Sequence, residues 1–288
     1  MRAVFYHELS SYFSSVSGYV FGAFLLFFTG IYTMVINLQA LMTNFEYVLS
    51  NASFVFLIIV PILTMRVIAE ERKQKTEQLL YSLPISMTKV ILGKYAALLV
   101  AFLIPIGIMS IYPIILSAFG NVYLPASYSA ICGFFFLGAA LIAVGVFVSS
   151  ITESQAVAAG ICFVVMLLNY FIASLAAYVS TTAFASFLAC TVLILVLAVV
   201  FRMMTKNTFM AIITGLIFEG ILLVCYILNS SSFEGLFSNI MEQLSLFERF
   251  YKFVDGIFDL TSIVYFITVI GLFLFLSVQS MEKRRWSE

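Results

Sequence analysis

One carboxylate, Glu219, stands in the middle of an apolar run at residues 209–228. A carboxylate inside a membrane usually faces a bundle interior and marks the path of an ion or a substrate. Hydrogen bonding to a neighbouring helix, for packing alone, is the competing interpretation. Asn169 and Tyr170 are further polar residues near the centre of an apolar run. We take these three residues as a candidate translocation path.

Motifs for nucleotide binding and catalysis are missing from the sequence. The chain has no GxxxxGK[ST] loop, and Lys94 follows one glycine without the spacing that lets a loop wrap a phosphate. It has no HExxH or GxSxG motif and a single histidine, His7. The 4 cysteines lie singly in apolar runs. We therefore expect no catalytic residue, no metal site and no cofactor in this chain.

A second candidate site is the charged segment at residues 66–94. Because a Lys or Arg at the bilayer centre costs roughly 2.5–3.5 kcal/mol, this segment must emerge into water between two membrane spans. Pro84 should break its helix, and Ser86 can cap a second short helix from Met87. Such a helix–break–helix suits the docking of a cytosolic partner, and an ordinary charged loop is the other interpretation. Its charged residues are Arg66, Glu70, Glu71, Arg72, Lys73, Lys75, Glu77, Lys89 and Lys94.

The composition indicates which kind of structural elements must position these residues. The chain is 63% hydrophobic and 10% charged, whereas a soluble domain is about a quarter charged. We expect one all-α polytopic membrane domain over residues 1–288, embedded in a lipid bilayer. Its zero net charge gives no reason to expect a nucleic-acid partner. The eight predicted spans are residues 18–41, 53–69, 95–118, 129–151, 156–178, 184–201, 209–228 and 262–281.

The segments outside the spans carry their own expectations. Residues 1–16 read as a short interfacial helix, residues 42–51 as a polar connection, and residues 229–261 as amphipathic interfacial helices. A count of six spans remains open if residues 183–228 form one re-entrant hairpin.

Prolines and small residues predict how two of the spans are built. Pro105 and Pro113 should kink the third span. Gly133, Gly138 and Gly145 form a small-residue face on the fourth span. That face predicts close helix packing, either within the chain or against a second copy.

Charge asymmetry orients the predicted spans. With eight spans both termini share a side with segment 66–94, residues 152–155 and residues 202–208. That side holds all of the 14 Lys and Arg residues except Arg249 and Lys252. The positive-inside rule therefore predicts cytoplasmic termini, in the cell membrane, with residues 229–261 outside.

Two stretches resemble a known family, the ABC-2-type transporter permeases. The segment RVIAEERKQKTEQLLYSLPISMTKVILGKY resembles the first cytoplasmic segment of that family, and residues 244–286 resemble the C-terminal end of its gliding-motility-type branch. The matching features of the first segment are the acidic pair Glu70 and Glu71, the basic Lys73 and Lys75, the core Glu77 to Leu80, the turn Pro84 to Ser86, and the pair Gly93 and Lys94.

The resemblance implies a type V exporter-like fold and an ATP-driven mechanism. In this family two permeases pair with two separate ATP-binding subunits, which hold ATP and Mg²⁺. The segment after the second span, here residues 70–94, forms a coupling helix in a cleft of the ATPase, and ATPase closure shifts the spans between inward- and outward-open states. Residues 1–16 would be the elbow helix and residues 229–261 an extracellular cap. The implied ATPase contacts are Glu70, Glu71, Arg72, Lys73, Glu77, Leu80, Leu83 and Pro84.

The expected function is that of a permease subunit of an ABC exporter. Its partners would be a cytosolic ATP-binding subunit, a second permease copy or a homologous permease, and an accessory protein outside or in the membrane. An apolar cavity lining favours lipids, apolar peptides or drug-like molecules as substrates. A membrane scaffold or sensor that recruits a cytosolic protein without transport is the alternative. An intramembrane enzyme that uses Glu219 is a third hypothesis, and it lacks a second catalytic group.

Overall fold

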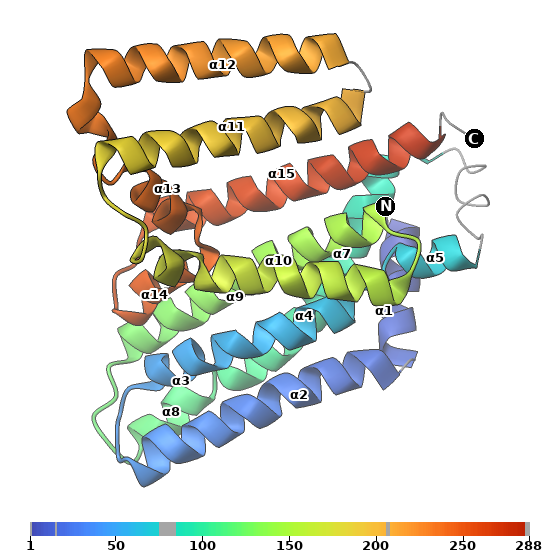
Figure 1. Ribbon diagram of the computed structural model, residues 1–288. Helices are drawn as coiled ribbons and strands as arrows, with labels where there is room; N and C mark the ends of the chain where they lie inside the picture. The colour runs from blue at the N-terminus through green and yellow to red at the C-terminus, as the bar shows by residue number, and fades with distance from the viewer. Residues whose placement is uncertain (1, 15, 75–84, 206–207, 286–288) are drawn as a thin grey trace. The chain divides into compact units, whose positions relative to one another are not determined.

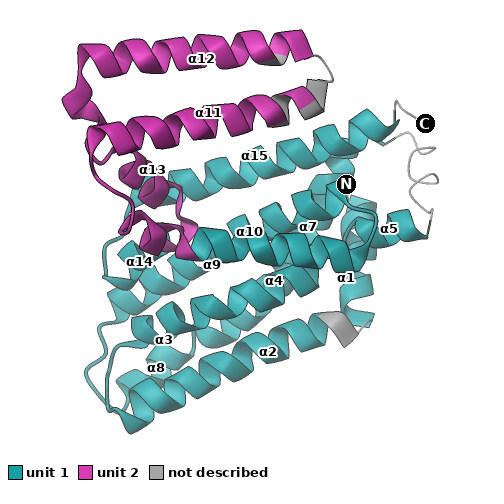
Figure 2. Ribbon diagram, in the orientation of Figure 1, with its two compact units in different colours: residues 1–170, 249–288 teal, residues 171–248 magenta. Residues whose placement is uncertain are grey.

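The computed structural model describes residues 2–14, 16–74, 85–205 and 208–285. The regular elements within these residues are helices, and they form two compact units: residues 1–170 with 249–288, and residues 171–248 (Figure 1; Figure 2). Seven of the described helices are long and apolar enough to cross a membrane, and Ala183–Val199 is a shorter apolar helix. The predicted all-α membrane fold is confirmed, and each predicted span corresponds to one of these apolar helices.

The first unit opens with α1 (Arg2–Ser14), which turns into α2 (Val16–Thr33). The turn brings Gly18 so close to Tyr12 that an added Cβ would lie 2.5 Å from the Tyr12 carbonyl oxygen. A separate helix before the first span was expected and is present as α1, and its place at the membrane interface stays a prediction. The unit continues with η1 (Met34–Gln39), α3 (Phe45–Ala52), η2 (Ser53–Val55), α4 (Phe56–Thr64), α5 (Ala69–Lys73), α7 (Met87–Met109), α8 (Tyr112–Ser117), α9 (Leu124–Ile151), most of α10 (Gln155–Ala176), most of α14 (Leu246–Val254) and α15 (Leu260–Arg285). Residues 171–176 of α10 and 246–248 of α14 belong to the second unit.

Helix α9 forms the core of the first unit, and most of its side chains are buried. Its small residues let neighbouring helices approach closely. A Cβ on Gly138 would collide with Phe102 of α7, one on Gly145 with Thr64 of α4, and one on Gly133 with Phe253 of α14. The predicted small-residue face is therefore confirmed, and it packs within the chain.

The second span begins earlier than the sequence predicted. Residues 42–51 were expected to be a polar connection, but α3 starts at Phe45 and the apolar helical stretch runs over Phe45–Lys73. Glu46 is one of the polar residues that suggested a connection, but it is buried. It accepts hydrogen bonds from Asn44 Nδ2 at 2.6 Å and Ser127 Oγ at 3.3 Å. These donors allow a carboxylate to lie inside the bundle.

The third span also differs from the expectation at both ends. No separate short helix begins at Met87, because α7 continues from Met87 to Met109. Ser86 precedes it in extended conformation without a side-chain cap bond. Pro113 lies in the first turn of α8, four residues after Met109, so its ring and missing N–H explain why α7 ends there. Pro105 lies inside α7 without ending it.

The amphipathic segment before the last span is helical, as predicted, but part of its apolar face is buried in protein. Phe250 and Phe253 of α14 are buried, and the Phe250 ring packs 5.9 Å from the Phe134 ring of α9. On the polar side, the Arg249 guanidinium lies 4.0 Å from the centre of the Tyr265 ring. The aromatic face of α14 therefore packs against α9, whereas the sequence predicted contact with the membrane interface.

The second unit contains α11 (Ala183–Thr205), α12 (Thr208–Leu228), η3 (Ser230–Phe233) and α13 (Leu236–Leu244). Helices α11 and α12 lie side by side as a hairpin (Figure 2). The rings of Phe187, Tyr226 and Phe233 pack together at one end of it. A left-handed turn at Gly235, whose amide donates to the Thr181 carbonyl at 2.9 Å, leads into α13.

Candidate functional site

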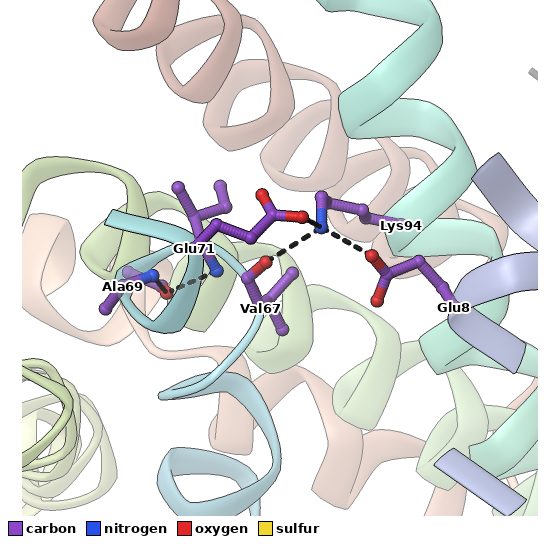
Figure 3. A network of polar contacts seen from close by, with 7 residues as sticks. Glu8, Val67, Ala69, Glu71 and Lys94 are labelled. Carbon is purple, nitrogen blue, oxygen red and sulfur yellow. Dashed lines mark hydrogen bonds and ion pairs between the residues drawn. The ribbon is translucent and has the colours of Figure 1, made fainter. Parts of the chain in front are cut away.

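The candidate site is the charged end of the first unit, where α1, α5 and the start of α7 meet (Figure 3). At its centre Lys94 of α7 is 2% exposed. Its ammonium group donates to Glu8 Oε1 at 2.5 Å, to Glu71 Oε1 at 2.7 Å and to the Val67 carbonyl at 3.0 Å. An ammonium group has three N–H donors, so these acceptors match its full capacity.

A serine of α9 fixes the start of α5. The first amides of a helix have no intrahelical acceptor and need another one. Ser149 Oγ accepts from the backbone N–H groups of Ile68 and Ala69, each at 3.1 Å, and lies 3.4 Å from the Met65 carbonyl. One buried hydroxyl therefore attaches the turn between α4 and α5 to the core helix.

Arg72 attaches the other side of α5 to the ends of two long helices. Its side chain is buried, and Nη1 donates to the Thr152 carbonyl at the end of α9, at 2.9 Å. Its Nη2 lies 3.8 Å from the Met281 sulfur of α15. Nearby, Arg284 pairs with Glu153 at 3.3 Å, which links the end of α15 to the residues after α9. The short α5 is thus held by polar contacts to α7, α9 and α15.

Tyr12 of α1 lies in the same charged neighbourhood. Its ring is buried, and that burial raises the pKa of the hydroxyl above its usual range, with the Glu8 carboxylate adding to the effect. A tyrosine hydroxyl is neutral at physiological pH even without such a shift, so Tyr12 adds no charge to the cluster. Helix α1 contributes both a neutral phenol and a charged acceptor to the site.

Comparison with known proteins assigns the family. The family model described as "ABC-2 family transporter protein" matches residues 31–277. The chain belongs to the ABC-2 transporter family. The searches of curated proteins and of solved structures gave no match. As an ABC-2 protein with several long apolar helices, the chain is a multi-pass membrane component of an ABC transporter.

The structure of this ABC-2 protein separates the expected coupling residues into two groups. Glu71 and Arg72 point into the chain, where they meet Lys94 and Thr152. Lys73 is exposed, and Glu70 is half-buried and accepts from Gln74 at 3.3 Å. Glu77, Leu80, Leu83 and Pro84 lie outside the described residues. The ATPase-contact role of all eight residues stays a prediction.

The candidate translocation residues belong to different units. Tyr170, in the first unit, packs its ring 5.5 Å from the Phe54 ring, and Asn169 precedes it on α10. Glu219, in the second unit, accepts a hydrogen bond from Thr191 Oγ1 at 2.7 Å, between α12 and α11. Its other carboxylate oxygen, Oε2, is buried and has no hydrogen-bond partner among the described residues. Their role in a translocation path stays a prediction.

The reasoning from sequence missed the partners of Lys94. Glu8 is the one acidic residue before Glu46, and Lys94 is a cation bordering an apolar run. A cation in that position needs a carboxylate partner, which is the signal that could have paired them. The role of Ser149 leaves no such signal, because serines are common in membrane helices.

Proposed function

We propose that this chain is the permease subunit of an ATP-driven ABC exporter. It would receive movement from a separate cytosolic ATP-binding subunit through α5 and the residues that follow it. ATP and Mg²⁺ would be held by that subunit, and a second permease copy or a homologous permease would complete the pair. Membership of the ABC-2 family supports the general role, because its membrane components work with such subunits.

The observation that carries the proposal is how α5 is held. A segment that only closed a loop would need no anchoring, yet α5 is anchored to α7 by an ion pair and to α9 and α15 by Arg72. Force applied to α5 would therefore reach several spans. Its exposed Lys73 and half-buried Glu70 are charged groups that a partner can contact.

Three finer assignments belong to the same proposal. The termini, segment 66–94 and the end of α9 would face the cytoplasm, as the charge asymmetry supports. Glu219, Asn169 and Tyr170 would line the translocation path. Membership of the gliding-motility-type branch rests on the resemblance of residues 244–286 alone.

The test is co-purification of the full chain with ATP-binding proteins of its host, followed by an assay of ATP hydrolysis. We expect an ATP-binding subunit in equal amount. We expect Lys73→Glu to weaken its binding about tenfold, or about 1.4 kcal/mol, because a charge at a contact surface is reversed. Arg2→Glu, which reverses an exposed cation of α1, is the matched control and should bind normally.

Two results would overturn the proposal in different ways. A stable chain that brings down no ATP-binding subunit would contradict the transporter role. A cytosolic protein that binds without any hydrolysis of ATP would favour a membrane scaffold or sensor.

A further inference from the structure

The polar contacts of Lys94 join α1, α7 and the α4–α5 turn. Glu8 comes from α1, Val67 from the turn before α5, and Glu71 from α5 itself (Figure 3). The Lys94 side chain is 2% exposed, so in this arrangement its acceptors are protein groups and not bulk water. Separation of any of the three segments from α7 would leave a buried charge with an unmade bond.

The attachment of α5 to α9 is of a different kind. Ser149 accepts from neutral amides, and the cationic Arg72 donates to a neutral carbonyl. Lys94 pairs with carboxylates on two different elements, so both partners of these bonds are charged. The ion pair of α5 is therefore the one to α7, and Glu8 brings α1 into the same cluster.

We propose that Lys94 is a positioning residue for coupling, which holds α1, α5 and the start of α7 together as one rigid joint. A displacement of α5 then moves α7, the third span, by the same amount. The N-terminal helix α1 moves with them. This inference rests on the proposed function, because it assigns how a push from the ATP-binding subunit is transmitted. It gives α1 a mechanical role beyond anchoring the chain in the membrane.

Distances measured by spin labels test the joint directly. The sample is the full chain in complex with its ATP-binding subunit, with the native cysteines replaced. One label pair is Gln74 with Leu92, and the second is Tyr6 with Leu92; all three side chains are exposed. Distances are recorded without nucleotide and after trapping with ATP, Mg²⁺ and vanadate. We expect both distance distributions to be the same in the two states.

The Lys94→Met variant removes the joint and keeps an unbranched side chain. We expect the Gln74–Leu92 distribution to shift or broaden on trapping, and stimulation of ATP hydrolysis by the permease to fall about tenfold, within the usual range for coupling between sites. Lys89→Met, which removes an exposed cation from the same helix, is the matched control. It should keep the wild-type distance distribution and the wild-type stimulation of ATP hydrolysis.

A folding defect is separated from a coupling defect by neutralising the whole cluster. The variant with Lys94→Met, Glu8→Gln and Glu71→Gln leaves no unpaired buried charge, so it should fold and bind the ATP-binding subunit. We expect it also to lose stimulation, because neutral side chains do not hold the joint.

The outcomes distinguish this inference from the proposed function. A wild-type complex that assembles and hydrolyses ATP, but whose Gln74–Leu92 distance changes on trapping, would overturn the joint and leave the permease role standing. If the neutral triple variant kept the stimulation of ATP hydrolysis and the distances of the wild type, the joint would also be overturned and the permease role would stand. Failure of the wild-type chain to bind any ATP-binding subunit would remove both.

Discussion

Two charged residues of apolar helices, Lys94 and Glu219, meet the cost of burial in different ways. Lys94 has three acceptors for three N–H groups. Glu219 has one donor, Thr191, and its second oxygen is buried without a hydrogen-bond partner among the described residues. A fully satisfied cluster fixes one arrangement, whereas a carboxylate oxygen without a hydrogen-bond donor can still accept from a donor group or bind a cation. The contrast supports a structural role for Lys94 and leaves Glu219 as the candidate path residue.

The first prediction concerns the stability of the Lys94 cluster. Lys94→Met strands two carboxylates around an apolar side chain and should lower the free energy of unfolding by about 3–5 kcal/mol. The measurement is chemical unfolding of the purified chain in detergent. Adding Glu8→Gln and Glu71→Gln to Lys94→Met should recover a large part of the loss. A single Lys94→Met variant as stable as wild type would contradict the buried ion pairs.

At the scale of elements, Ser149 is predicted to hold the start of α5. Ser149→Ala leaves the amides of Ile68 and Ala69 without their acceptor, a loss of about 1–3 kcal/mol in local stability. Hydrogen exchange at these two amides should therefore become faster by about tenfold or more. Ser150→Ala is the matched control, because the Ser150 hydroxyl bonds to the Phe147 carbonyl of its own helix. Equal protection in both variants would show that Ser149 does not hold the turn.

The last span begins after an ionisable cap. Asp259 precedes α15, and its carboxylate accepts from the Thr261 amide at 2.9 Å and from Ser262 Oγ at 2.7 Å. These bonds, the Ser262 bond first, lower the pKa of the Asp259 carboxyl. The cap therefore contributes its full stability above the pKa of the unfolded state, about 3.9, and loses it as the pH falls through the lower folded value.

Asp259→Ala should accordingly cost about 1 kcal/mol at neutral pH, as expected for a lost helix cap. The difference in unfolding free energy between this variant and wild type should disappear at low pH. Unfolding in detergent at several pH values measures it. A difference that stays constant down to pH values below the carboxyl range would show that the cap is not ionic.

The helices of this chain were easier to predict than their contacts. Long apolar runs identified the spans. In lipid, a single chain segment can satisfy its own backbone hydrogen bonds only as a helix. Boundaries failed where a polar residue had a partner far away in the sequence, as with Glu46 and Ser127. The charged segment 66–94 was recognised from its charges, but the inward direction of Glu71 and Arg72 depends on Lys94 and Thr152, which no local pattern reveals.

At the scale of the whole molecule, the open question is whether α11 crosses the membrane or forms one arm of a re-entrant hairpin. At about 1.5 Å per residue, the 23 residues of α11 rise roughly 34 Å, but its apolar part, Ala183–Val199, rises only roughly 25 Å against a hydrocarbon core of about 30 Å. Length alone therefore does not decide the matter, and the eight-span prediction is a full crossing. In that case Arg202, near the end of α11, lies on the same side as Lys73, and Asp255 lies on the opposite side.

Single cysteines at these positions, in a chain without its native cysteines, decide the matter in intact cells. A maleimide that cannot cross membranes should label Asp255→Cys directly, and Lys73→Cys and Arg202→Cys only after permeabilisation. Labelling of Arg202→Cys from outside, with Lys73→Cys still protected, would establish the re-entrant hairpin and the six-span count. Direct labelling of Lys73→Cys with protection of Asp255→Cys would overturn the predicted orientation. The charged segment would then face away from the compartment that holds ATP, so α5 could not contact a cytosolic ATP-binding subunit.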